Sequence, residues 1–297
     1  MSAMHDDEVP IDAALVSRLV AEQFPEWASL DVAPVASTGT DNAIYRLGSD
    51  KTVRLPRRPS AVAQIEKEQR WLPVLAPHLP LAVPVPLGRG APGHGFPWPW
   101  SVYSWIEGEV ATLERLADRD AAARELAGFI VALQRIDARE GPLAGPHNSS
   151  RGVPLQARDA AVRHALPRQP PEIDRGAARA AWDAALAAPV FHGAPVWLHG
   201  DLQSQNLLAH SRRLRAVIDF GCLGVGDPAC DLMVAWSLFE SNERASFRAT
   251  LAPDAAAWAR GRGWALYFGL VALPYYRETN PTLAGIARHA IAEALRG

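Results

Sequence analysis

The sequence predicts an α+β protein of two lobes, the first built on strands and the second mainly on helices. Short apolar runs separated by turn residues dominate the first third of the chain. Beyond about residue 107, Ala- and Leu-rich segments with helical spacing become frequent. We therefore predict an N-terminal lobe over residues 1–107 and a C-terminal lobe over residues 108–297. A chain of 297 residues has enough mass for both.

Local patterns define the elements of the first lobe. Residues 11–24 carry apolar side chains at helical spacing and predict an amphipathic helix. Small residues separate two apolar runs within residues 32–47, which predicts a strand, a turn and a strand. We predict two more strands, over residues 52–55 and 100–106. A helix is predicted over residues 60–75, which Pro73 perturbs or ends, and a Gly- and Pro-rich hairpin or loop over residues 88–99.

The second lobe has one strand-rich interval between helical segments. Residues 113–137 are periodic and predict a long helix, whereas residues 141–175 are Arg- and Pro-rich and irregular. A short helix over residues 177–186 precedes a strand–loop–strand–turn–strand pattern over residues 196–220. From Asp231 onward the pattern is helical.

Charge and cysteine content exclude several functional classes. The chain has 30 Lys and Arg against 32 Asp and Glu, a net charge of −2, so we expect no nucleic-acid or membrane partner. Its first ten residues are acidic and lack the basic-then-apolar pattern of a signal peptide. The two cysteines form neither a disulfide framework nor a zinc-site spacing. We expect a cytoplasmic protein.

The residues that carry chemistry lie within the strand-rich interval. Asp201 follows an apolar strand, Asn206 comes five residues later, and Asp219 follows after thirteen more, on a turn with a glycine. One carboxylate can accept a hydroxyl proton. The other carboxylate and the amide oxygen are hard ligands that suit Mg²⁺. Together these groups indicate phosphoryl transfer.

This segment resembles the catalytic and metal-binding signatures of kinases. It reads His-Gly-Asp at 199–201, Asn206 and Asp-Phe-Gly at 219–221, followed by Gly-Asp-Pro at 226–228 and Asp231. His-Gly-Asp in place of His-Arg-Asp resembles the aminoglycoside phosphotransferase family. The resemblance implies a protein-kinase-like fold, with an antiparallel sheet and a helix in the N-terminal lobe. It also implies a phosphotransferase that uses ATP or GTP with Mg²⁺ and an alcohol group as acceptor. Residues 37–42 and 53–58 are most similar to the macrolide phosphotransferase branch.

The resemblance assigns roles in the second lobe residue by residue. Asp201 matches the catalytic aspartate, which orients the substrate hydroxyl and takes its proton late in the transfer. Asn206 and Asp219 match the Mg²⁺ ligands. His199 would support the catalytic loop, and Asp231 would hold the loop backbone by hydrogen bonds.

The first lobe departs from the kinase pattern at one position. Val53 and Leu55 alternate with Arg54, so Arg54 faces away from the core, where kinases have a lysine that binds phosphates. Arginine can bind phosphates through its planar fork. Its partner would be Glu68 or Glu66. Helical spacing favours Glu68, which falls among apolar neighbours, although a solvated helix face is the alternative.

The remaining nucleotide contacts follow from the same resemblance. The loop around Thr38 and Gly39 would hold phosphates through backbone N–H groups and hydroxyls, and its alternative is a plain hairpin turn. Tyr103 would control the inner pocket, while the backbone from Ser104 to Ile106 would read the nucleotide base. Main-chain contacts alone do not predict whether the nucleotide is ATP or GTP.

The acceptor side is less defined. Aminoglycosides are polycations that require carboxylates, whereas macrolides require an apolar cleft. The helical region offers both, and we take Trp236 and Glu240 as candidates, although most helix aromatics pack in cores.

The sequence therefore predicts a small-molecule kinase acting on an antibiotic of the macrolide or aminoglycoside type. One alternative is a kinase of a sugar, amino alcohol or amino acid. Another is a degenerate homologue that binds nucleotide without chemistry, for which Arg54 and the single glycine of the phosphate loop argue. A protein kinase is disfavoured because the chain lacks an Ala-Pro-Glu segment and a long activation loop.

Overall fold

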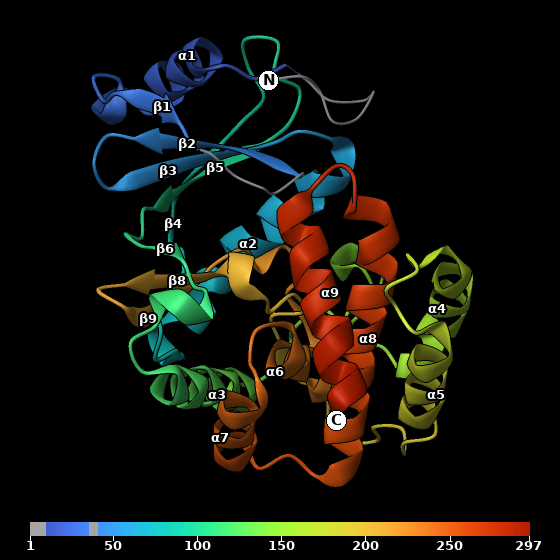
Figure 1. Cartoon of the computed structure of the whole chain (residues 1–297). Coiled ribbons are helices and arrows are strands. Elements are labelled where there is room, and N and C mark those ends of the chain that lie inside the picture. The colour runs from blue at the N-terminus through green and yellow to red at the C-terminus, as the bar shows by residue number, and fades with distance from the viewer. Residues whose placement is uncertain (1–9, 36–40) are drawn as a thin grey trace. The chain divides into compact units, whose positions relative to one another are not determined.

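The computed structural model describes residues 10–35 and 41–297, which form two compact units (Figure 1). The first unit contains Met1–Pro77 and Ala82–Glu107, and the second contains His78–Leu81 and Gly108–Gly297. The first carries an antiparallel sheet and the second is mainly helical, so the predicted α+β class is confirmed.

A five-stranded antiparallel sheet organises the first unit. The strands lie in the order β1-β2-β3-β5-β4. Their bounds are Val32–Pro34 for β1, Asn42–Leu47 for β2, Lys51–Pro56 for β3, Pro86–Gly90 for β4 and Trp100–Ser104 for β5. Strand β3 is therefore paired on both sides, which holds its side chains in a defined register.

Alternation along β3 gives the sheet two chemically different faces. Val53 and Leu55 are fully buried in a hydrophobic cluster with the apolar side of α1 (Ala13–Gln23). Arg54 lies between them and belongs to the opposite face. Fully burying an aliphatic side chain contributes about 1.5–3 kcal/mol. A one-residue slip would place Arg54 in the hydrophobic cluster and move Val53 and Leu55 to the polar face, and it is therefore strongly disfavoured.

The second helix of this unit, α2 (Val62–Leu75), contacts β4 and β5. Its Gln69 amide donates to Ser101 Oγ at 2.8 Å, and Ser101 lies opposite Arg54 in the β3–β5 pairing. Helix α2 thus borders the face of the sheet that carries Arg54.

Short strands in the second unit position the loops of interest. They form a two-stranded pair, β7 (Val196–Leu198) with β10 (Gly224–Gly226), and a three-stranded sheet of β6 (Glu109–Val110), β8 (Leu207–His210) and β9 (Arg213–Val217). The loop from β7 to β8 and the turn after β9 contain the residues with the kinase-like signature.

The rest of the second unit is helical, and capping residues in the sequence set several helix starts. The helices are α3 (Arg119–Arg135), α4 (Asp159–Ala165), α5 (Arg175–Leu186), α6 (Val234–Ser237), α7 (Ser241–Leu251), α8 (Ala255–Tyr276) and α9 (Pro281–Arg296). Helices α3, α5, α8 and α9 begin at an Asp or Asn whose side chain accepts a backbone N–H bond of 2.6–3.1 Å. Helices α8 and α9 pack side by side (Figure 1).

Helix α2 ends at Leu75, as predicted, because the backbone bond that Pro73 removes in the last turn costs little against the burial of Leu72 and Leu75. Two details differ from the sequence prediction. The long helix starts at Arg119, after the Asp118 cap, instead of at residue 113. The segment expected to be irregular contains α4. No described helix is both long and apolar enough to cross a membrane.

Candidate active site

The buried carboxylate of Asp231 holds the backbone of the loop between β7 and β8. Asp231 Oδ2 accepts the backbone N–H of His199 at 2.8 Å, and its Oδ1 accepts the N–H of Gly200 at 2.7 Å. Burial raises the pKa of Asp231, while the N–H donors of Gly200 and His199 oppose that rise. The structural role of Asp231 stays a prediction, and these two bonds support it.

His199 is fully buried and spans the loop and the strand end. Its Nδ1 accepts the backbone N–H of Asp201 at 3.2 Å, so the ring proton resides on Nε2, which donates to the Ile218 carbonyl at 3.0 Å. The ring also packs edge-on against Phe220. His199 therefore links the backbone before Asp219 to the backbone of Asp201, as a support residue would.

Asn206 and Asp201 are joined directly. The Asn206 amide Nδ2 donates to the Asp201 backbone carbonyl at 2.8 Å and to Asp201 Oδ2 at 3.0 Å. The backbone carbonyl of Asn206 accepts the N–H of Ile218 at 2.9 Å, which places Asp219 next along the chain. Asp219 has a left-handed backbone, with φ of 61°, and its Oδ1 accepts the Gly221 N–H. A left-handed Asp is uncommon and marks a locally constrained turn.

The donor set of this segment fits a magnesium ion. With Nδ2 of Asn206 directed at Asp201, the amide presents its Oδ1 on the other side, and Asp219 adds a carboxylate. Mg²⁺ is commonly held by one or two such protein oxygens together with substrate phosphates and water. Among the described residues there is no cluster of three His, Cys, Asp or Glu side chains suited to a metal. Asn206 and Asp219 are thus the candidates that the sequence and structure offer.

Arg151 is a site residue that the sequence reasoning missed. Its Nη2 lies 3.4 Å from Asp201 Oδ1, and the side chain is only 12% exposed. Burial alone lowers the pKa of Arg151, but the Asp201 carboxylate and nearby thiols outweigh it, and the net pKa is raised. No signal pointed to Arg151, because it lies 50 residues before Asp201 in the segment that has no periodicity.

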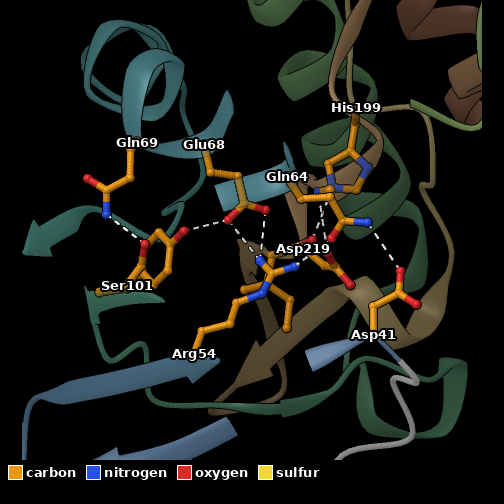
Figure 2. A network of polar contacts seen from close by, with 11 residues as sticks. Asp41, Arg54, Gln64, Glu68, Gln69, Ser101, His199 and Asp219 are labelled. Carbon is orange, nitrogen blue, oxygen red and sulfur yellow. Dashed lines mark hydrogen bonds and ion pairs between the residues drawn. The ribbon is translucent and has the colours of Figure 1, made fainter. Parts of the chain in front are cut away.

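In the first unit, Arg54 forms a buried ion pair with Glu68 of α2 (Figure 2). Its Nη1 lies 2.7 Å from Oε1 and 2.8 Å from Oε2 of Glu68. The hydroxyl of Tyr103 donates to Glu68 Oε2 at 2.6 Å. Burial and the Glu68 carboxylate raise the pKa of Tyr103 well above its ordinary value. Glu66, the other candidate partner, pairs with Arg89 at 2.8 Å on the exposed side of the helix.

The rest of the Arg54 fork is also hydrogen-bonded, by residues that the sequence reasoning did not select. Nη2 donates to Gln64 Oε1 at 3.4 Å. The network places the amide oxygen of Asn42 toward Arg54, where it accepts from Nε at 3.1 Å and Nη2 at 2.9 Å. Gln64 in turn donates to Asp41 Oδ2 at 3.1 Å (Figure 2). A lysine could not make this set of contacts, because it lacks the planar fork.

The other proposed nucleotide contacts are placed in part. The N–H of Ser104 donates to the Val85 carbonyl at 2.9 Å and that of Trp105 to the Asp50 carbonyl at 2.8 Å, so both N–H groups bind residues that directly precede the neighbouring strands β4 and β3. Ile106 follows the end of β5. The predicted phosphate residues Thr38 and Gly39 lie outside the described residues.

The structure corrects the prediction for Trp236. This side chain is fully buried and its ring centroid lies 4.5 Å from that of Trp258. Because no part of it reaches the surface, Trp236 is a core residue and not an acceptor contact. Glu240 is exposed, and its nearest cation is Arg119 at 4.0 Å. The acceptor role of Glu240 stays a prediction.

Comparison with known proteins gives a family match over most of the chain. A family model described as "Phosphotransferase enzyme family" matches residues 32–264. A search of curated proteins finds no match.

Solved structures of similar fold cover nearly the whole chain. The GDP complex of wild-type aminoglycoside 2'-phosphotransferase-IIIa is 18% identical, with a TM-score of 0.73 over 96% of this chain and 99% of that one. Macrolide 2'-phosphotransferase MphH from Brachybacterium faecium is 24% identical, with a TM-score of 0.59 over 95% and 98%. The streptomycin–ATP complex of APH(2")-IIa is 18% identical, with a TM-score of 0.62 over 97% of each chain.

At these identities the structural matches establish the fold, an antiparallel sheet in the N-terminal part with a helical C-terminal part. The family match covers the segment that carries His199, Asp201, Asn206 and Asp219. The predicted kinase-like fold, the suspected family and the enzyme class are therefore confirmed. A catalytic-loop signature, a kinase-like fold and a match to most of the chain agree, and the chain belongs to the phosphotransferase enzyme family.

Proposed function

We propose that this protein transfers the γ-phosphoryl group of ATP or GTP to a hydroxyl of a small molecule. The observation that carries the proposal is the contact of Asn206 with Asp201, at 2.8 and 3.0 Å, within the segment that matches the family. This contact joins a proton acceptor to a metal-ligand candidate in one short loop, and both groups are needed for phosphoryl transfer.

Asp201 acts on the acceptor in this proposal. The substrate hydroxyl donates to the Asp201 carboxylate, which orients the oxygen toward the phosphorus and takes the proton late in the transfer. Little other covalent work is required of the protein, because the transition state is loose and rate enhancement comes mostly from positioning and charge. The bonds from Asp231 and His199 to the loop backbone support that positioning by keeping Asp201 in one orientation.

Asn206 and Asp219 would hold Mg²⁺ with the nucleotide phosphates. The ion supplies neutralisation of the negative charge on the transferring group. The chain contributes an amide oxygen and a carboxylate, while the Asn206 N–H bonds to Asp201 hold the amide in the orientation that presents its oxygen.

Arg54 takes the place of the phosphate-binding lysine. Glu68 and Tyr103 hold its Nη1 side, and Asn42 and Gln64 hold the rest of the fork. A cation fixed this way loses little side-chain entropy on binding a phosphate. Thr38 and Gly39 would add phosphate contacts, and the backbone at Ser104 and Ile106 would read the base.

Two observations bear on the class of acceptor. Similar structures are named as aminoglycoside and macrolide phosphotransferases, which favours an antibiotic acceptor. A sugar, amino alcohol or amino acid is the alternative, because a shared fold does not choose a substrate. Of the two predicted acceptor residues, only Glu240 is exposed enough to contact one.

A nucleotide-binding homologue without activity is the second candidate function. The observation that favours it is the close engagement of Arg54 by Glu68, Asn42 and Gln64, which leaves a guanidinium less able to follow a moving phosphoryl group.

One experiment tests both candidates. The purified full chain is incubated with Mg²⁺ and ATP or GTP, alone and with macrolides, aminoglycosides, sugars and amino alcohols, and products are followed by mass. We expect a gain of one phosphoryl group on an acceptor and its loss in Asp201→Asn and Asp219→Ala. Asp254→Asn is the matched control, because Asn retains the N-cap of α8 while removing a carboxylate. Nucleotide binding without hydrolysis or product, equal in wild type and Asp201→Asn, would support the inactive homologue instead.

A further inference from the structure

The surroundings of Asp201 are rich in hydrogen-bond donors that lack acceptors. Nε and Nη1 of Arg151 are buried and, among the described residues, have no hydrogen-bond partner. The same holds for Nε of Arg158 and Nε1 of Trp264. A buried donor without an acceptor costs about 1–3 kcal/mol, and more when it is charged. A native protein tolerates such a cluster where a ligand supplies the acceptors.

The residues that carry these donors are neighbours of the Tyr267 ring. The guanidinium of Arg151 lies 6.0 Å from the ring of Trp264 and 5.6 Å from the ring of Tyr267, both on α8. The guanidinium of Arg158 lies 5.8 Å from the same Tyr267 ring. Two cations and the Trp264 ring thus lie around Tyr267, and Arg151 links this group to the Asp201 carboxylate.

The contact of Arg151 with a carboxylate is long. Asp201 meets Arg151 through one nitrogen at 3.4 Å, which is long for a charged hydrogen bond. Asp159, the carboxylate next to Arg158 in sequence, bonds instead to Arg163 and to the Trp182 indole. Arg151 is therefore only loosely paired, and Asp159 is engaged elsewhere.

We infer that Arg151 is a specificity residue that binds an anionic group of the acceptor, a carboxylate or a phosphate, beside the hydroxyl that Asp201 engages. The inference rests on the proposed phosphoryl transfer and narrows its acceptor. An oxyanion against the Arg151 guanidinium supplies an acceptor to a cation that has unpaired donors and only a long contact with Asp201. Arg158 adds a second cation near the same group. A polycationic aminoglycoside would instead place its ammonium groups against Arg151, so it fits this site poorly.

The test compares acceptors in pairs that differ mainly in charge. Full-length protein with Mg²⁺ and nucleotide is given gluconate or glucose 6-phosphate against glucose, and glycerate against glycerol, with kanamycin as the polycation. Binding is followed by thermal shift and transfer by product mass. The carboxylate and phosphate members distinguish the two sources of the anion. We expect the anions to stabilise the wild type and to give the larger kcat/KM.

Variants assign the effect to Arg151. Arg151→Gln should weaken anion binding about tenfold to a hundredfold, the usual worth of a charged hydrogen bond, while nucleotide affinity stays unchanged. Arg151→Lys should restore part of the charge preference. Arg139→Gln is the matched control, since Arg139 is exposed and pairs only locally with Asp137.

Several outcomes would overturn the inference. One is transfer to kanamycin or to the uncharged partners with a kcat/KM equal to or above that of the anions. Another is the absence of any anion whose stabilising effect depends on Arg151. If Arg151→Gln and Arg151→Lys lower thermal stability equally and leave the charge preference unchanged, the residue is structural only. Failure of the proposed phosphoryl transfer gives a different result from failure of this inference. In that case no acceptor gains a phosphoryl group, and nucleotide binding and hydrolysis are the same in the wild type and in the Asp201 and Asp219 variants.

Discussion

Nη1 of Arg54 lies within 2.8 Å of both carboxylate oxygens of Glu68, and the pair is almost completely buried. The desolvation of two charges is offset only because each partner is paired and further hydrogen-bonded. The hydroxyl of Tyr103 donates a further hydrogen bond to the Glu68 carboxylate, and the amide oxygen of Asn42 accepts from the Arg54 guanidinium. Arginine at this position therefore belongs to a hydrogen-bond network that requires its planar guanidinium, and a lysine could not form it.

Removing one member of this pair should destabilise the fold strongly. Glu68→Gln leaves the Arg54 guanidinium buried without its counter-charge, and we expect a loss of about 3–5 kcal/mol in the free energy of unfolding. Urea denaturation followed by circular dichroism measures this loss. The matched control is Glu66→Gln on the same helix, whose exposed pair with Arg89 contributes at most about 1 kcal/mol. Equal losses in the two variants would show that the buried pair has no special importance.

Replacing Arg54 by lysine tests what the fork contributes. Lysine can keep the contact with Glu68 but loses the bonds to Asn42 and Gln64. We expect Arg54→Lys to fold, with a several-fold higher Kd for nucleotide, and Arg54→Met to lose nucleotide binding. Isothermal titration with ATP and GTP measures both. Unchanged nucleotide affinity in Arg54→Met would remove Arg54 from the phosphate site.

Asp231→Asn should loosen the catalytic loop. The substitution replaces one acceptor oxygen with a donor NH₂ that faces the N–H of His199 or Gly200. We expect a lower melting temperature and a fall in kcat with little change in the KM for nucleotide, because the first unit is untouched. Hydrogen exchange at the amides of residues 199 and 200 provides a local readout. Unchanged protection of these amides would contradict the role that we propose for Asp231.

Asn206→Ala should change the magnesium requirement. The variant removes an amide oxygen from the proposed metal site and both N–H bonds to Asp201. We expect the Mg²⁺ concentration for half-maximal activity to rise about tenfold, the low end of the effect of losing a charge-assisted ligand. A titration of initial rate against Mg²⁺ measures it. Gln205→Ala is a neighbouring control, and an equal rise in that variant would argue against a ligand role for Asn206.

The two cysteines should differ in reactivity. Burial raises the pKa of Cys230 well above its ordinary value, with Asp231 adding to the rise, so the reactive thiolate is scarce at neutral pH. Cys222 is only partly buried. We expect iodoacetamide at pH 8 to label Cys222 first and Cys230 only after unfolding, as read by peptide mass. Labelling of Cys230 at a comparable rate in the folded protein would contradict this expectation.

The sequence by itself determined the features that depend on short-range order. Alternation along residues 53–55 separated Arg54 from the core, and helical spacing ranked Glu68 above Glu66. The motif from His199 to Asp219 indicated phosphoryl transfer because its residues are close in sequence and sit on one loop and one turn. These patterns are local, so strand period, helix period and loop length are enough to read them.

Only the tertiary structure decided which distant residues meet. It brings Arg151, from a segment without periodicity, into contact with Asp201. It surrounds Arg54 with Asn42 and Gln64. It also buries Trp236 in the core. A tryptophan in a helix has the same sequence pattern whether it lines a site or packs inside. The difference is made by neighbours such as Trp258, which fill its surroundings through contacts between separate elements, and such contacts have no period along the chain.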